Sequence, residues 1–268
     1  PARVLGLAGA PGPRNGERAV QVELRERTFG ELIGLTFSLT AAHCGKLLAI
    51  AVPLGLPGLA VQLISLNTPR TRRAVLLAVL LGLLGLALFL ALLPLEIGAS
   101  LLIVSGSFTG NEYPLGASLR AAFRKLGPLL AYSLTTGVHI LVGLLCLVVP
   151  GLVFLTWYYV GSVVIMVENL GGTAAVNRSK ELSAGHRWPL FAFIIFLGVL
   201  INGTAIVTTM VLDSVLDHSP NLSTVLGWGA SMVFSLPGIV APVVYYFQLR
   251  VVKEALDVQS LSSLVGAV

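Results

Sequence analysis

The sequence predicts an all-α protein whose helices cross a membrane several times. Of its 268 residues, 56% are hydrophobic and only 11% are charged, whereas soluble domains average roughly 45–50% and about 25%. Leu, Val, Ala and Gly fill long runs, and residues 74–95 exceed the roughly 20 residues that a helix needs to cross about 30 Å of hydrocarbon. The predicted fold is therefore a polytopic transmembrane helix bundle, with no stretch left for a sizeable soluble domain.

The N-terminal segment differs from the rest of the chain. Residues 1–27 are rich in Gly and Pro and then mixed in charge, unlike a secretory signal peptide with its basic start, apolar core and small-residue cleavage site. We expect residues 1–27 to form a flexible tail, residues 28–262 a membrane domain, and residues 263–268 a short C-terminal tail.

Windows of about 20 apolar residues predict six membrane spans. They lie at about 44–66, 74–97, 127–149, 150–168, 189–212 and 224–249. The second apolar run continues to Phe108. Two possibilities stay open for it: one long tilted helix, or a helix with an extension broken near Pro94.

A short amphipathic helix is predicted before each odd-numbered span, at about 28–42, 114–126 and 173–185. In the first, one helical face carries Phe29, Leu32, Ile33, Thr36 and Phe37. In the second helix, the same spacing places five residues on one face, namely Leu115, Leu119, Ala122, Phe123 and Leu126. The third has a weaker stripe of Ala175, Ser179 and Leu182. Helices of this kind lie along a membrane surface.

The third of these helices occupies a polar island at residues 169–191. Thr173 is the expected N-cap, residues 174–184 the helix, and Gly185 its C-terminal stop. Pro189 suits the first turn of the fifth span. Lipid headgroups are expected around His186, Arg187 and Trp188.

The segments before the spans also resemble one another. Residues 39–48, LTAAHCGKLL, align without a gap on residues 182–191, LSAGHRWPLF, and residues 119–130 match more loosely. We interpret the chain as one two-span unit used three times, each copy preceded by its interfacial helix. This arrangement places the three interfacial helices on one side of the membrane.

The charge distribution predicts which side that is. With the tail, the interfacial helices and the C-terminus in the cytoplasm, all of the 17 Lys and Arg except Arg70, Arg72 and Arg73 lie inside. The chain is therefore expected in the cell (inner, cytoplasmic) membrane with both termini cytoplasmic. A seven-segment arrangement, with residues 74–110 as a hairpin, would also move the three arginines inside, but the repeat requires an even number and favours six.

Four stretches carry a family resemblance when taken together: GELIGLTFSL, VVPGLV, AAVNRSKELSAGHRWPL and VVYYFQLRVVKEALDV. They resemble the bacterial and archaeal membrane domain fused to some glycerophosphodiester phosphodiesterases, and related stand-alone six-span proteins of poorly defined function. The resemblance covers roughly residues 28–261 and implies a fold. In the fused enzymes, catalysis belongs to a separate barrel domain with metal-binding carboxylates and paired histidines, for which we expect no room in this chain, so no enzyme is implied.

No motif predicts catalysis, a cofactor or a metal ion. His43, His139, His186 and His218 show no His-Glu-x-x-His spacing, and no Cys-x-x-Cys, Gly-x-Ser-x-Gly or Walker pattern occurs. No aromatic-interleaved basic stripe suggests nucleic acid. The chain is expected to be no enzyme, to hold no cofactor or metal, and to bind no nucleic acid.

Polar residues inside spans are the usual pointers to function, because charge at the bilayer centre is costly. The candidate intramembrane site consists of Glu96, His139 and Asn202. Glu96 follows Pro94 and could carry a proton or cation, or be a partly hydrated residue near a helix end. His139 and Asn202 could instead serve only as hydrogen-bond donors between helices, and a Glu96–His139 pairing is a hypothesis.

A basic surface is the best partner signal. It consists of Arg120, Arg124, Lys125, Arg178, Lys180 and Arg187. Near the cytoplasmic leaflet these residues attract anionic lipid headgroups, and they could also bind other membrane-protein subunits. The favoured function is a non-catalytic scaffold or accessory subunit of a membrane complex; the alternative is a transporter, channel or lipid-handling protein with a central cavity between the repeats.

Overall fold

The computed structural model describes residues 22–68, 71–146 and 148–254. Arg70, most of the predicted N-terminal tail and the whole predicted C-terminal tail lie outside this range. The described residues form nine helices, namely α1 (Phe29–Asn67), α2 (Arg72–Thr109), α3 (Leu115–Arg124), α4 (Leu126–Cys146), α5 (Val148–Tyr158), α6 (Gly161–Val167), α7 (Gly172–Ser183), α8 (Arg187–Val215) and α9 (Pro220–Glu254).

Within this part of the chain, six helical segments are long and apolar enough to cross a membrane. They are Phe29–Asn67, Arg72–Thr109, Leu126–Cys146, Val149–Val167, Arg187–Val215 and Pro220–Glu254. The predicted helical class and the number six are confirmed, and the chain is a multi-pass membrane protein. Helix α2 runs past Pro94 without a break, so the hairpin that a seven-segment arrangement needs is not formed.

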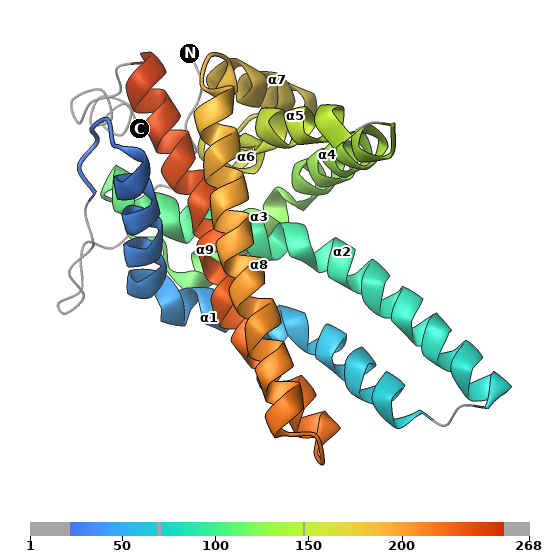
Figure 1. Ribbon diagram of the computed structural model, residues 1–268. Coiled ribbons are helices and arrows are strands. Elements are labelled where there is room, and N and C mark those ends of the chain that lie inside the picture. Colours follow the sequence, from blue (N-terminus) through green and yellow to red (C-terminus); the bar gives the residue numbers. More distant parts are fainter. Residues whose placement is uncertain (1–21, 69–70, 147, 255–268) are drawn as a thin grey trace.

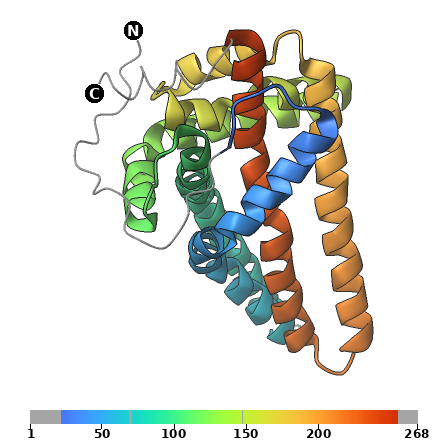
Figure 2. The same cartoon turned by 90° about the vertical axis from the view of Figure 1, so that its left-hand side faces the viewer.

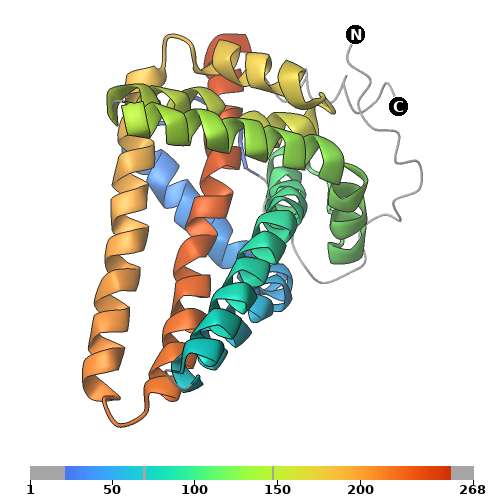
Figure 3. The same ribbon diagram turned by 90° about the vertical axis from the view of Figure 1, so that its right-hand side faces the viewer.

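The long helices pair as three hairpins in chain order, α1–α2, α4–α5 and α8–α9. Helix α9 is central, because it contacts α1, α2 and α8 as well as the short helices α6 and α7 (Figures 1 and 2). The α4–α5 hairpin runs crosswise to α8 and α9 (Figure 3).

Helix α1 joins the first predicted interfacial helix to the first predicted span. At its start the Glu31 carboxylate accepts hydrogen bonds from the backbone N–H and the hydroxyl of Thr28, over 2.8 and 3.0 Å, as in a capping box. The helix continues to its end with Pro53 and Pro57 inside it. The separate helix predicted at 28–42 is therefore the first part of a longer helix that changes direction along its length (Figure 1), and prolines are the usual cause of such a bend.

The fourth predicted span, residues 150–168, is divided between α5 and α6. The break leaves carbonyl groups at the end of α5 without helical partners, and a buried carbonyl group needs another donor. The Tyr132 hydroxyl on α4 donates to the Tyr158 carbonyl. The Ser179 hydroxyl on α7 donates to the Trp157 carbonyl over 2.7 Å. Side chains of the neighbouring helices α4 and α7 thus bind the carbonyl groups that the break leaves without helical partners.

A glycine makes the first of these bonds possible. A Cβ at Gly161 would overlap the hydroxyl and ring of Tyr132. The ring therefore reaches the end of α5 only because α6 begins with a residue that has no side chain.

The second and third predicted interfacial helices are separate helices, α3 and α7. Helix α3 lies within the predicted range 114–126, and α7 agrees with the predicted range 173–185 to within two residues. The weak stripe predicted for α7 is buried, since Ala175, Ser179 and Leu182 are at most 1% exposed. Because α7 contacts α4, α5 and α6, this stripe packs against protein and does not face lipid.

The two ends of α7 test the predicted caps. The N-cap is Gly171, so the assignment of Thr173 was wrong: Thr173 lies inside the first turn. At the other end Gly185 has a φ of +85°, the left-handed conformation typical of the residue that ends a helix. That prediction is confirmed, and Pro189 lies in the first turn of α8 as expected.

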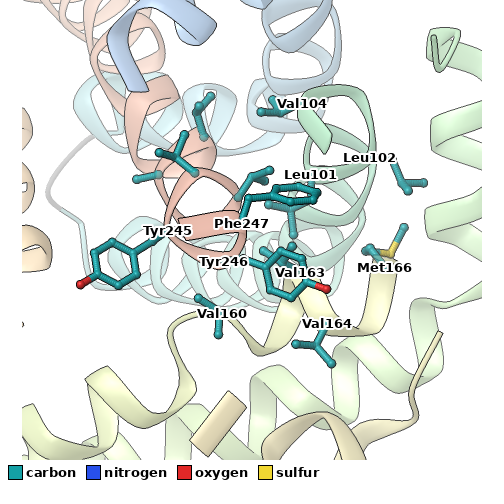
Figure 4. Packing of buried hydrophobic residues seen from close by; sticks show 14 of the residues in the cluster. Leu101, Leu102, Val104, Val160, Val163, Val164, Met166, Tyr245, Tyr246 and Phe247 are labelled. Carbon is teal, nitrogen blue, oxygen red and sulfur yellow. The ribbon is translucent and has the colours of Figure 1, made fainter. Parts of the chain in front are cut away.

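The buried core lies where α2, α6 and α9 meet (Figure 4). The rings of Phe108 and Phe247 stack there, with centroids 4.3 Å apart. Side chains at most 1% exposed surround them, including Leu101, Val104, Val160, Val163, Val164 and Met166. The first half of α2 is different, because Leu80 and Leu84 are 63% and 64% exposed. An apolar surface of this size is covered by lipid rather than water.

Two glycines allow α4 and α5 to pack backbone to backbone. A Cβ at Gly143 would lie 2.8 Å from the backbone of Gly151, and a Cβ at Gly151 would overlap Leu144. Small residues at such crossings are the main means by which helices approach closely in lipid.

The first prediction tests this contact. Gly143→Ala should lower the free energy of unfolding by about 1–3 kcal/mol, because the added methyl overpacks the crossing. Gly137→Ala is the matched control on the same helix, where a Cβ meets no atom within 4 Å, and it should be neutral or stabilising by up to about 1 kcal/mol. Unfolding in detergent followed by circular dichroism measures both, and equal effects would contradict the close crossing.

Candidate functional site

Five polar side chains from three helical segments form a closed cycle of hydrogen bonds. We call this cycle the polar ring. Its members, in bonded order, are Tyr246, Glu168, Arg178, Glu254 and Arg250. Glu168 follows the last residue of α6, Arg178 lies on α7, and the other three lie on α9. The ring therefore joins the end of the broken fourth span to the central helix.

Each bond of the ring has a clear donor. The Tyr246 hydroxyl donates to Glu168 Oε1 over 2.8 Å. Arg178 donates through Nε to Glu168 Oε2 over 3.0 Å and through Nη2 to Glu254. Arg250 donates through Nε to Glu254 Oε2 over 2.8 Å and through Nη1 to the Tyr246 oxygen over 3.2 Å. Both arginines thus bridge two ring members, a use that suits the guanidinium group.

Local structure positions these side chains. Tyr246, Arg250 and Glu254 are spaced by four residues on α9, so they lie on one helical face. Glu168 is the C-cap of α6, and Asn169 after it has a φ of 56°, a left-handed conformation that Asn tolerates better than most residues. This turn starts the chain toward α7, which carries Arg178.

The ring is electrically neutral, with two carboxylates and two guanidinium groups. Its charged side chains are between 14% and 29% exposed, so they are screened less than surface pairs. Burial by itself lowers the pKa of Arg178, but the hydrogen bonds to Glu168 and Glu254 outweigh it, and the pKa is raised. Arg178 therefore stays charged at any physiological pH, and the ring is a stable junction.

Lys125 makes a second polar junction beside the ring. Its ammonium donates to the carbonyls of Ile165 and Met166 over 2.9 and 3.2 Å, which are among the last carbonyls of α6. Burial lowers the pKa of Lys125 to about 8. Lys125 is thus a C-terminal cap for α6 rather than a free surface charge.

A third group of polar side chains gathers around Trp157. Lys180 Nζ and Arg187 Cζ lie 5.3 and 5.1 Å from the centroid of the Trp157 ring, distances typical of cation–π contacts. We call Lys180, Arg187 and Trp157 the cation–indole cluster. It joins α5, α7 and the start of α8.

Two of the three predicted intramembrane residues, His139 and Asn202, form hydrogen bonds within their own helices. His139 Nδ1 lies 2.6 Å from the Thr135 carbonyl on its own helix, and its ring lies against that of Phe154. The Asn202 amide donates to the carbonyl of Gly198 on its own helix over 2.8 Å. Both side chains are exposed on the surface of the protein. Neither side chain forms a hydrogen bond to another helix among the described residues.

Glu96 is half-buried on α2, just before the buried part of that helix. No hydrogen bond or ion pair joins it to His139 or Asn202 among the described residues, so the hypothesised Glu96–His139 pairing is not formed. The three candidates do not make one site.

The predicted basic surface divides into groups with different partners. Arg178 belongs to the polar ring, Lys125 caps α6, and Lys180 and Arg187 belong to the cation–indole cluster. Only Arg120 and Arg124 on α3 are exposed without such contacts in the described structure. The six residues of the predicted basic surface therefore do not form one surface in the structure.

Four members of the polar ring were not among the predicted site residues, namely Glu168, Tyr246, Arg250 and Glu254. A signal for three of them was present, since a Tyr, an Arg and a Glu repeat at intervals of four in YYFQLRVVKE. Nothing in the sequence links that face of α9 to Glu168 and Arg178, which lie more than 60 residues earlier in the chain.

The described part of the chain offers no candidate metal centre. In the described ranges, no three His, Cys, Asp or Glu side chains lie where they could hold a metal ion. Comparison of the chain with protein-family models, with curated proteins and with solved structures found no match.

The second prediction tests the polar ring. Arg178→Gln should lower the free energy of unfolding by about 1–3 kcal/mol, because it leaves two half-buried carboxylates each without one partner. Arg120→Gln removes the same charge from an exposed position and should change stability by no more than about 0.5 kcal/mol. Unfolding in detergent measures both variants, and similar losses would show that the ring does not stabilise the junction.

Proposed function

We propose that this chain is a non-catalytic membrane module that serves as a scaffold or accessory subunit of a larger membrane complex. The polar ring is the observation that carries this proposal. Its charged groups neutralise one another and hold α6, α7 and α9 together. These acidic and basic groups bind one another and so stabilise one arrangement of the helices.

The contacts of the intramembrane residues support the same function. Asn202 and His139 direct hydrogen-bonding atoms to the backbone of their own helices, which is how isolated polar residues are satisfied in lipid. The large apolar surfaces of α2 and α4 are available for contact with lipid or with other membrane subunits.

The proposed setting is the cytoplasmic membrane, with both termini on the cytoplasmic side and anionic lipid at the basic residues. Residues 22–28, α7 and the end of α9 gather at one end of the molecule (Figure 2), which supports a common side for these segments. The three hairpins are compatible with a threefold use of one two-span unit. The resemblance to the membrane domain of glycerophosphodiester phosphodiesterase-type proteins also favours a module without catalysis of its own.

The third prediction tests the scaffold function. The full chain, purified from its native membrane in mild detergent, should elute with another membrane protein at a fixed stoichiometry, as measured by light scattering and quantitative mass spectrometry. The partner should be retained by Arg178→Lys, which keeps the charge of the ring. A lone, monodisperse chain with lipid bound at its centre would contradict the scaffold and favour lipid handling.

One observation favours the alternative of a transporter or channel. Glu96 is half-buried within a span, two residues after Pro94, and has no hydrogen bond or ion pair with any other described residue. An ionisable group in that position is a common element of proton and cation pathways.

The fourth prediction tests this alternative. If the chain conducts protons or cations, proteoliposomes containing it will show flux above empty liposomes, and Glu96→Gln will reduce that flux about tenfold or more by removing the ionisable group. Glu112→Gln is the matched control, because Glu112 is an exposed carboxylate outside the spans. Flux that is absent, or equal in both variants, would leave Glu96 without a transport role.

A further inference from the structure

We infer that the cation–indole cluster at the junction of α5, α7 and α8 binds the phosphate group of an anionic lipid. Two cations from different helices converge there on one indole ring, with Lys180 Nζ 5.3 Å and Arg187 Cζ 5.1 Å from its centroid. Lys180 Nζ also lies 5.5 Å from the centroid of the Tyr158 ring. The inference rests on the proposed contact of the basic residues with anionic lipid and deepens it by naming one site, which lies at the membrane surface.

Neither cation of the cluster has an anionic partner in the described structure. Other basic residues do have oxygen partners: Arg178 and Arg250 bind carboxylates, and Lys125 binds carbonyls. A contact with a ring face satisfies none of the N–H donors of Lys180 or Arg187 with an oxygen. Both cations lie close to the same indole ring, so an anion bound beside that ring is attracted by each of them.

Two further polar atoms at the same junction have no hydrogen-bond partner among the described residues. They are Trp157 Nε1 and His186 Nδ1, and both are shielded from solvent. Helix α8 begins at Arg187, and its N-cap makes no side-chain capping bond. The first N–H groups of a long helix carry a partial positive charge and favour phosphate. The cluster thus combines two full charges with several unused polar groups.

The surroundings favour a lipid phosphate over a free one. Trp188, next to Arg187, is 81% exposed and packs edge to face with Phe191 at 6.2 Å. Exposed Trp residues beside cations are typical of the depth of the lipid headgroups. Helix α8 begins here at Arg187, is 29 residues long and is mostly apolar. The acyl chains of a bound lipid would therefore meet apolar side chains.

The experiment uses the full chain in nanodiscs of phosphatidylcholine containing a minor fraction of phosphatidylglycerol, with native mass spectrometry counting the retained phosphatidylglycerol. Lys180→Gln with Arg187→Gln should weaken retention about tenfold or more, since each basic residue near anionic lipid contributes substantially. The charge-conserving exchange Lys180→Arg with Arg187→Lys should stay within about threefold of the original chain, because it keeps both positive charges near the lipid. The matched control, Arg120→Gln with Arg124→Gln, removes the same number of charges from exposed positions on α3 and should weaken retention clearly less than the loss of Lys180 and Arg187, because Arg120 and Arg124 share no aromatic ring in the described structure.

Three results would overturn the inference. Equal losses in the two Gln pairs would mean that net surface charge alone retains the lipid, and unchanged retention would mean that the cluster holds none. Displacement of phosphatidylglycerol by millimolar inorganic phosphate would identify a free-anion site instead. Arg187→Gln alone, checked for a monodisperse elution profile, replaces the double variant if that one misfolds. Because the isolated chain is used, the outcome is independent of any protein partner.

Discussion

The break in the fourth apolar segment is the feature on which the polar end of the molecule depends. A helix interrupted in the protein interior leaves buried carbonyl groups that water cannot reach, so side chains must bind them. Tyr132 and Ser179 do so at the end of α5, and Lys125 does so at the end of α6. These bonds draw α4, α7 and the α3–α4 junction to the same place. The crosswise α4–α5 hairpin and the position of α7 both follow from them.

The same break brings Glu168 to α9. Once α6 turns the chain, its C-cap carboxylate lies within hydrogen-bond distance of Tyr246 and Arg178. Charges there are neutralised within the polar ring, while Lys180 and Arg187, only a few residues away, contact aromatic rings and no anion. In our proposal, the paired charges of the polar ring stabilise the fold, whereas the two cations without an anionic partner face the lipid headgroups.

Part of the candidate site was predictable, and part was not. Arg178, Lys180 and Arg187 were identified as polar residues near the membrane surface, because a basic island between apolar runs stands out in a sequence. Their separate partners were not predictable, since Glu168, Trp157 and Glu254 come from segments that only folding brings together. Glu96, His139 and Asn202 were grouped because each is polar within an apolar run, but that pattern carries no information about which helices are neighbours.

The sequence by itself determined the helical class, the six apolar segments and the stop of α7 at Gly185, because hydrophobic run length and the conformational freedom of glycine are local properties. Only the tertiary structure decided that residues 29–67 form one helix, that the fourth apolar segment is broken, and that α4–α5 lies crosswise to α8–α9. The physical reason is that apolar helices can pack in many different arrangements that are all compatible with a lipid environment. The choice among them depends on a few close contacts, such as Gly143 on Gly151 and Gly161 beneath Tyr132, and on the polar bonds that those contacts permit.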